Sequence, residues 1–295
     1  MLDDDLRAAI ERALGVGKAA AWQACGATGW GQAWSLATAD ARYFVKLASG
    51  RHMPMLACEA DGLVALARTA TMRVPRVIAV GACGTTAFLA MEWLDLEARA
   101  PAAPLGRALA ALHRAPTPRG PAGERFGWHR ENWIGATPQA NGWCDDWCEF
   151  FGERRLAPQL ALAEANGFGG LRRDGERVLA ALPQLLDHRP APSLVHGDLW
   201  SGNADTLRDG TPVVFDPAVY VGDREVDIAM TELFGGFGRD FRTGYEITWP
   251  LDGGYGRRRA VYDLYHLLNH LNLFGAGYLR RVEVTLAALI EHGER

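Results

Sequence analysis

The sequence predicts an α+β protein of two lobes: a small antiparallel sheet with one helix in residues 1–93, then a larger, mainly helical lobe in residues 94–295. Three observations predict this fold. Short runs rich in β-branched and aromatic residues alternate with glycine turns in the first part. Apolar residues at helical spacing dominate from Leu105 onwards. One turn-rich stretch, Leu194 to Pro217, interrupts the helices with closely spaced His, Asp and Asn.

Composition limits the possible partners and location. The chain has 295 residues, of which 48% are hydrophobic and 22% charged, which is enough to bury a sizeable core. With 31 basic and 35 acidic residues it offers no basic surface, so we expect no nucleic-acid partner. No apolar run reaches membrane-spanning length, and we expect no membrane association. Five cysteines, an odd number at low density, favour a reducing compartment, so the expected location is cytoplasmic. Nothing in the sequence indicates an oligomeric state.

The N-terminal elements lead to an isolated lysine. Residues 2–14 have the apolar spacing of a helix, and residues 19–48 predict three strands with a turn containing Gly29 and Gly31. This turn matches neither common phosphate-loop pattern, so it serves either a plain hairpin or a ligand-covering loop. Only two of the 31 basic residues are lysines, and Lys46 closes the third strand. A compact point charge is therefore needed there.

The next helix supplies a possible partner for this charge. Residues 54–68 have helical spacing, and Glu59 lies in an otherwise mostly apolar stretch. We expect Glu59 to pair with Lys46; the alternative is an exposed helix glutamate. Two more strands, at 77–80 and 86–93, lead through Met91, Glu92 and Leu94 into a polar connector between the lobes.

The second lobe begins with a helix at 105–113 and a long loop at 115–143 that contains three tryptophans. The tryptophans either cover a ligand or pin the loop to the core. Helices are expected at 145–163, 171–182, 262–274 and 282–290, with a bend at 234–241. Cys144 and Cys148 lie four residues apart, but buried thiols are favoured over a metal site because no second ligand pair accompanies them.

The stretch from 194 to 217 predicts the chemistry. His196, Asp198 and Asn203 reproduce the spacing H-x-D-x-x-x-x-N of kinase catalytic loops, and a short apolar strand then ends at Asp216. Phosphoryl transfer needs a carboxylate base and oxygen ligands for Mg2+. We therefore expect Asp198 to be the base and Asn203 with Asp216 to bind Mg2+. The alternative is that these are ordinary turn residues.

The remaining candidate residues fit around ATP. In this hypothesis Lys46, oriented by Glu59, holds the α- and β-phosphates, and the turn with Gly29 and Gly31 covers them. Backbone groups near Glu92 bind the adenine while Met91 and Leu94 pack against it; ordinary strand-end packing is the alternative. Structural support comes from His196 and from Asp227, which lies in the first turn of a helix predicted from residue 220. We expect Asp227 to hold the backbone of the loop at 196–203.

Taken together, these motifs resemble the fructosamine kinase (ketosamine-3-kinase) family, relatives of the aminoglycoside and choline kinases with a protein-kinase-like fold. The resemblance runs nearly end to end. The motifs that carry it are YFVK ending at Lys46, PQANGW at 138–143, HGDLWSGN at 196–203, FDPA at 215–218, FGGF at 234–237 and Asn269-His270.

The resemblance implies a substrate class. Family members phosphorylate the 3-hydroxyl of a sugar joined through C1 to an amine, and the unstable ester then frees the amine, which is a deglycation repair reaction. The acceptor is then a small-molecule or protein-borne ketosamine, fructosamine or ribulosamine, and Trp200, Asn269 and His270 are implied to line the sugar pocket. Two alternatives remain: a kinase for an aminoglycoside or choline-like acceptor, and an ATP-binding regulator without activity, motivated by the unusual glycine turn.

Overall fold

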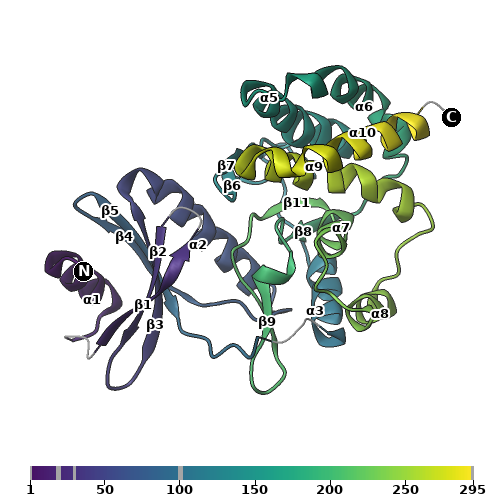
Figure 1. Cartoon of the computed structure of the whole chain (residues 1–295). Coiled ribbons are helices and arrows are strands. Elements are labelled where there is room, and N and C mark those ends of the chain that lie inside the picture. Colours follow the sequence, from purple (N-terminus) through teal and green to yellow (C-terminus); the bar gives the residue numbers. More distant parts are fainter. Residues whose placement is uncertain (1, 18–20, 29–30, 99–101, 294–295) are drawn as a thin grey trace.

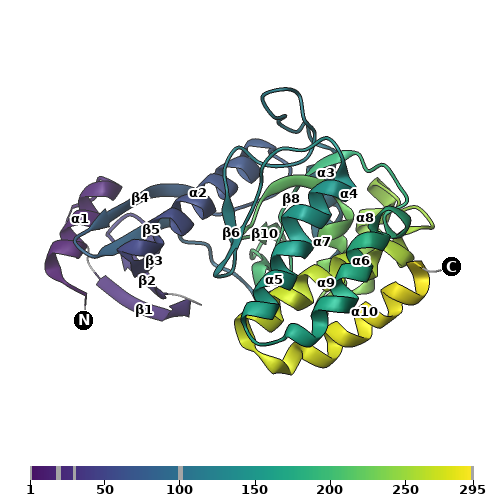
Figure 2. The same ribbon diagram turned by 90° about the horizontal axis from the view of Figure 1, so that it is seen from above.

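The computed structural model describes residues 2–17, 21–28, 31–98 and 102–293. Figures 1 and 2 show a sheet near the N-terminus at one end of the molecule and a group of helices at the other end, where the C-terminus lies. The predicted fold class is confirmed: an antiparallel five-stranded sheet is followed by a mainly helical lobe. None of the described helices is both long enough and apolar enough to cross a bilayer.

The N-terminal sheet places Lys46 on its inner face. Its strands run antiparallel in the order β1-β2-β3-β5-β4. Because side chains alternate along a strand, Val45 and Leu47 of β3 pack with Leu6 and Ile10 of helix α1, whereas Lys46 points to the other face. That face is covered by helix α2. The bounds are α1 Asp4–Leu14, β1 Ala21–Thr28, β2 Gly31–Ala37, β3 Arg42–Ser49, α2 Met53–Arg68, β4 Val77–Cys83 and β5 Thr86–Glu92.

Helix α2 of the N-terminal lobe packs against the helical lobe. In Figure 2 it runs from the sheet toward the helical lobe. A Cβ added at Gly62 on its buried side would lie 3.2 Å from side-chain atoms of Pro217 and Val219, so α2 packs closely on the segment that follows Asp216. The helix that carries Glu59 is therefore anchored against the opposite side of the candidate site.

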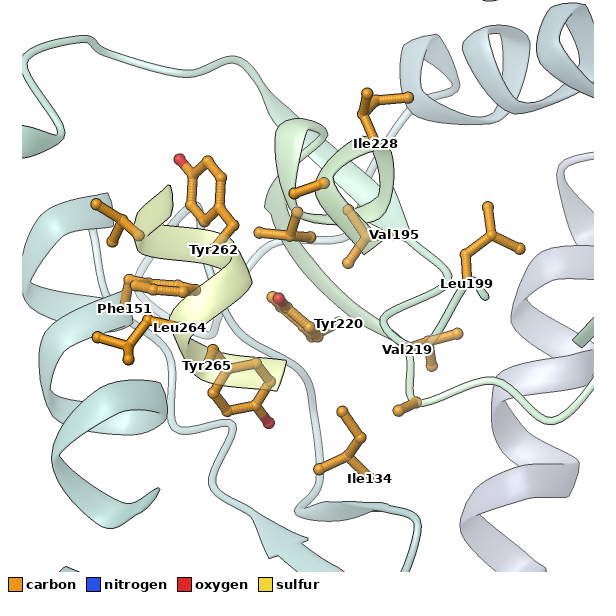
Figure 3. Close-up of a cluster of buried hydrophobic side chains, with 14 of the residues drawn as sticks. Ile134, Phe151, Val195, Leu199, Val219, Tyr220, Ile228, Tyr262, Leu264 and Tyr265 are labelled. Atoms are coloured by element: carbon orange, nitrogen blue, oxygen red, sulfur yellow. The ribbon is translucent and has the colours of Figure 1, made fainter. Parts of the chain in front are cut away.

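The helical lobe is built around a large apolar core. Figure 3 shows Tyr220 within it, with Phe151, Tyr262 and Tyr265 on one side and Val195 and Val219 on the other. The helices and strands of this lobe are α3 Ala103–Arg114, β6 Asn132–Ile134, β7 Thr137–Gln139, α4 Trp147–Phe151, α5 Ala157–Ala165, α6 Arg172–Leu185, β8 Pro192–Val195, β9 Ala204–Thr206, β10 Pro212–Val214, β11 Tyr220–Asp223, α7 Glu225–Leu233, α8 Arg239–Thr248, α9 Tyr255–Phe274 and α10 Leu279–Gly293.

Three local predictions were wrong. Residues 220–223 form strand β11, not the start of a helix, because they pair antiparallel with β8 at 192–195. The long loop contains the hairpin β6–β7. Helix α8 begins inside the stretch predicted to be a bend. Each error concerns a short element whose partner lies elsewhere in the chain, which a local apolar pattern cannot reveal.

Candidate active site

Hydrogen bonds join the loop at 196–203 to the segment at 215–218. The His196 ring contacts the Phe215 carbonyl oxygen through Nε2 at 3.0 Å, and the Ala218 amide donates to the His196 carbonyl at 2.8 Å. The Phe215 amide donates to the Asn203 carbonyl at 3.1 Å. These three contacts fix the two segments relative to each other, although they are well separated along the chain.

A glycine is required at the centre of this junction. Gly197 has a φ of 82°, in the left-handed region that favours glycine. A Cβ at this position would lie 2.1 Å from the Ala218 carbonyl oxygen, which is far too close. The glycine of the HGD sequence therefore permits the close approach of the two segments.

The junction brings three oxygen-bearing side chains together. Asn203 donates through Nδ2 to the Asp198 carbonyl at 2.9 Å and lies 3.4 Å from the Asp198 carboxylate. The same nitrogen is 3.5 Å from the Asp216 carbonyl. Asp216 is one of the few non-glycine residues with a positive φ, 56°. Such a backbone is sparsely populated and clusters at functional sites, where it aims a side chain.

Lys46 reaches this group from the sheet. Its ammonium donates to Glu59 at 2.7 Å and to Asp216 at 2.5 Å. Burial by itself lowers the pKa of Lys46, but the two carboxylates outweigh it and hold the pKa well above its ordinary value. Lys46 is therefore a permanent cation at the junction of the two lobes.

Asp198 is a carboxylate with a perturbed pKa. Burial, together with the negative charges of Asp216 and Asp227, raises the pKa of Asp198 to about 7 against the opposing effect of the hydrogen bond from Asn203. A carboxylate that titrates near neutral pH beside a cavity has the properties of a general base.

Asp227 holds the backbone of the loop at 196–203 in place. Its carboxylate accepts the backbone N–H groups of His196 at 2.7 Å and Gly197 at 2.8 Å, and it contacts His113 Nε2 at 3.1 Å. Burial alone would raise the pKa of Asp227, yet the His113 hydrogen bond and neighbouring donors bring the net value below the ordinary one. A buried carboxylate with this many donors is ionised and rigidly placed.

A cavity of about 920 Å3 lies between the lobes and is lined by Lys46, Glu59, Asp198, Asn203 and Asp216. The end of β5, with Met91 and Glu92, and the connector that follows it, with Leu94, form another wall. The Glu92 amide donates to the Arg76 carbonyl and its carboxylate accepts from Arg73 at 2.7 Å. Glu92 is thus engaged with the protein itself, while no described residue accepts from the Leu94 amide.

Strands β1 and β2 form the roof of the cavity through Cys25, Ala27 and Ala33. Gly31 starts β2 and is not among the lining residues, whereas Gly29 lies outside the described residues. Trp200 does line the cavity and is 41% exposed.

The predicted lining roles of Asn269 and His270 are wrong. Asn269 is buried and accepts from Gln159 at 3.1 Å. His270 packs between the rings of Phe234 and Phe274, and neither Asn269 nor His270 lines the cavity. Asn269 faces the core and His270 lies half-buried in an aromatic cluster, which the sequence motif could not indicate.

A buried arginine behind the site was not predicted. Arg155 lies in a π-helical turn, Gly152–Leu156, and is completely buried. It donates to the Ala140 carbonyl and, at 2.7 Å, to the Asn141 side chain, and its guanidinium lies 4.0 Å from the Tyr220 ring centroid. Within the described part of the chain, Arg155 contacts backbone carbonyls, a side-chain amide and aromatic rings. A buried cation without a paired carboxylate is costly, so its contacts must be maintained.

The arginine anchors a cluster of buried amides. Asn132 accepts from both Asn141 and Gln139 at 2.8 Å and donates to the Val219 carbonyl at 2.8 Å. Gln139 also donates to the Ala218 carbonyl at 3.3 Å. These contacts fix the backbone directly after Asp216. The PQANGW motif pointed to this segment, but only the fold reveals its contacts with 218–219.

Replacing Asn132 by leucine is expected to lower the free energy of unfolding by about 2–3 kcal/mol, because the change leaves buried amide and carbonyl groups without partners. Urea denaturation measures this loss. Asn166→Leu is the matched control, since Asn166 is exposed and its substitution is expected to cost about 0.5 kcal/mol or less. Equal losses for both variants would contradict a supporting role of the cluster.

The side-chain oxygen atoms at the cavity are suitable ligands for a hard divalent cation. Asn203 and the carboxylate of Asp216, which is 45% exposed, offer the amide and carboxylate oxygens that Mg2+ prefers. Elsewhere in the described chain, His188, Asp223 and Glu225 form a cluster with possible metal-ligand spacing. There, however, Arg258 donates to both Glu225 oxygens, at 2.7 and 2.6 Å, and already supplies the positive charge. Cys144 and Cys148 belong to no such cluster and are half-buried, not buried as expected.

Comparisons with known proteins agree on one family. The family model for fructosamine kinase matches residues 5–292. A probable ketoamine kinase from Synechocystis is 46% identical over 258 residues, which cover 86% of this chain and 85% of the relative. A solved structure from Thermobifida fusca, assigned as a fructosamine-3-kinase, is 33% identical, has a TM-score of 0.85 and covers 98% of this chain and 100% of its own.

A solved aminoglycoside phosphotransferase shares the fold alone: it is 15% identical, has a TM-score of 0.59, and 98% of each chain is covered. The fold is therefore protein-kinase-like. The family model, the similar sequence and the similar structure together lead to one conclusion: this chain belongs to the fructosamine kinase family, a family of kinases that act on ketoamines.

Proposed function

We propose that the protein transfers the γ-phosphate of ATP to the 3-hydroxyl of a ketosamine, a fructosamine or ribulosamine, as a small molecule or on a protein. The observation that carries this proposal is the meeting of Asp198, Asn203 and Asp216 with Lys46 at one cavity, in a chain of this family. The phosphate ester then decomposes and frees the amine, so the reaction serves deglycation repair. Five free thiols support a reducing, cytoplasmic setting.

Asp198 is the proposed base. As the acceptor oxygen forms its bond to the γ-phosphorus, the bond from phosphorus to the bridging oxygen breaks and ADP leaves. The hydroxyl proton passes to the Asp198 carboxylate, whose raised pKa makes it a stronger base than an ordinary aspartate. Asp227 and His196 keep this carboxylate in place through the loop backbone.

Lys46 is proposed to pair with the α- and β-phosphates. Its present partner Asp216 is the only one of the two carboxylates that is substantially exposed, at 45% against 9% for Glu59. Phosphate oxygens can therefore take over the place of Asp216, while Glu59 keeps the ammonium oriented. The released Asp216 carboxylate and the Asn203 amide oxygen would be the groups that hold Mg2+. Bound there, Mg2+ neutralises the charge of the β- and γ-phosphates.

The connector is proposed to bind the adenine. Met91 is buried beneath the cavity, Phe44 and Leu94 also line it, and these apolar groups can enclose a purine ring. The Leu94 amide is the proposed hydrogen-bond donor to the adenine, because the Glu92 and Trp93 amides before it already donate to the Arg76 and Arg42 carbonyls.

Removing the metal is expected to abolish transfer. EDTA should stop the reaction and added Mg2+ should restore it. Asn203→Ala removes one proposed ligand, so the Mg2+ concentration for half-maximal activity is expected to rise at least about tenfold, the loss typical of weakening a metal site. A titration of initial rate against Mg2+ measures this. An unchanged Mg2+ requirement would exclude Asn203 as a ligand.

An acceptor panel tests the function. Fructosyl, ribulosyl and erythrulosyl amines are compared with aminoglycosides and choline by ADP release, and NMR of the product locates the phosphate. We expect transfer to the 3-hydroxyl of at least one ketosamine. Transfer only to an aminoglycoside or to choline would mean that the protein is a kinase for that acceptor and not for ketosamines. ATP binding without transfer to any acceptor would favour the alternative of an inactive ATP-binding regulator.

A further inference from the structure

The cavity has an apolar rim on the side of the helical lobe. We define this apolar rim as Trp133, Gly135, Ala136, Leu273 and Phe274, all of which line the cavity. The first three come from the hairpin β6–β7 and the last two from the end of α9. A Cβ added at Gly135 would lie 3.0 Å from Leu273 Cδ1, so the two segments touch and form one continuous surface.

Phe274 is exposed in an unusual way. It is 67% exposed, yet the ring is supported, with its centroid 5.4 Å from His270 and 6.2 Å from Tyr278. His270 is itself packed against Phe234, with ring centroids 4.5 Å apart. A ligand that covers this exposed apolar ring removes its surface from water, which favours binding.

The apolar rim contributes no charge. The charged residues that line the cavity within the described chain come from other segments and are Lys46, Glu59, Glu92, Asp95, Asp198, Arg208 and Asp216. Arg208 pairs with Glu97 of the connector at 3.3 Å and so belongs to the opposite, nucleotide side. An acceptor with extra ammonium groups would therefore find no counter-charge at the rim, whereas an alkyl chain would be covered on more than one side.

We propose that the apolar rim binds the alkyl chain of the amine to which the sugar is attached. The inference rests on the proposed function, because it places the sugar beside Asp198 and Trp200 and continues from C1 of the sugar to the rim. The substrate class is thus a ketosamine of an uncharged alkylamine chain, such as the methylene stem of a lysine side chain, and not of a polyamine. Phe274 is the residue that determines this preference.

The experiment compares three acceptors that carry the same fructosyl group: on ammonia, on hexylamine and on 1,6-diaminohexane, which differs from hexylamine by one terminal ammonium. For the wild type, kcat/KM is expected to be about tenfold higher for the hexylamine compound than for the ammonia compound, as expected if about two methylene groups are buried. The gain should appear in KM, because contacts remote from the reacting atoms strengthen binding without changing the chemistry. The diamine compound should lose most of this gain.

Phe274→Ala is expected to reduce the ratio between the hexylamine and ammonia compounds from about ten to about two. Phe274→Leu should keep most of it. Ile247→Ala is the matched control, because Ile247 is 75% exposed on α8 and does not line the cavity, and the ratio should stay as in the wild type. If the wild type does not discriminate between hexylamine and ammonia compounds, or if Phe274→Ala keeps the full ratio, the inference is wrong and the kinase function stands. If no ketosamine is phosphorylated, the proposed function fails and this inference fails with it.

Discussion

Asp198→Asn is expected to lower kcat by about a thousandfold, within the range that a general base contributes. Asparagine has the same shape and keeps the contact with Asn203, but it cannot accept the hydroxyl proton. Affinity for ATP should change little, since Asp198 is not bonded to Lys46. The variant should be at least as stable as the wild type, because the change removes one of three neighbouring negative charges, those of Asp198, Asp216 and Asp227.

The measurement couples ADP formation to a ketosamine acceptor and determines ATP affinity by calorimetry. Asp240→Asn, an exposed aspartate in the first turn of α8, serves as the matched control and should retain wild-type kcat. If Asp198→Asn kept kcat within tenfold of the wild type, Asp198 would not be the base. Loss of turnover with intact ATP binding would exclude the regulator alternative, because an active site would then have been inactivated.

Asp227→Ala is expected to lower the free energy of unfolding by about 3–5 kcal/mol, the cost of removing one partner from a buried ionic network. The substitution leaves the backbone N–H groups of His196 and Gly197 without their acceptor and removes the partner of His113 Nε2. Activity should fall as well, because the loop that carries Asp198 loses its attachment.

Urea denaturation provides the unfolding free energy for this comparison. Asp252→Ala is the control: its carboxylate also has a basic partner, Arg258, but its side chain is 63% exposed, against 1% for Asp227. Arg258 is buried but keeps its two bonds to Glu225 when Asp252 is removed, so loss of this largely exposed carboxylate is expected to cost about 1 kcal/mol or less. Comparable losses for the two variants would mean that Asp227 does not support the loop as proposed.

The sequence was informative where chemistry imposes a local spacing. Asp198 and Asn203 lie five residues apart on a turning loop, and Asp216 follows a short strand, so their convergence could be predicted from the chain itself. The pairing of Lys46 with Glu59 could also be predicted, because a buried charge in each of two adjacent elements needs a partner.

Contacts between distant segments could not be predicted in the same way. The cross-bonds at Gly197 and the amide cluster of Asn132 and Gln139 depend on how loops pack against residues 215–219. For the same reason the family motif Asn269-His270 does not reveal that Asn269 is buried in the core and that His270 packs between Phe234 and Phe274. A motif identifies a segment, whereas side-chain direction is set by tertiary packing.

The most direct test replaces Mg2+ by Mn2+ in a crystal of the protein with a non-hydrolysable ATP analogue, and locates the metal by its anomalous scattering. We predict the metal between the analogue's phosphates and the side chains of Asn203 and Asp216, with metal–oxygen distances of about 2.0–2.3 Å. The Asp198 carboxylate should then face the open position where an acceptor hydroxyl would bind. A metal bound elsewhere, such as at His188 and Asp223, with Asn203 and Asp216 left without it, would contradict the account.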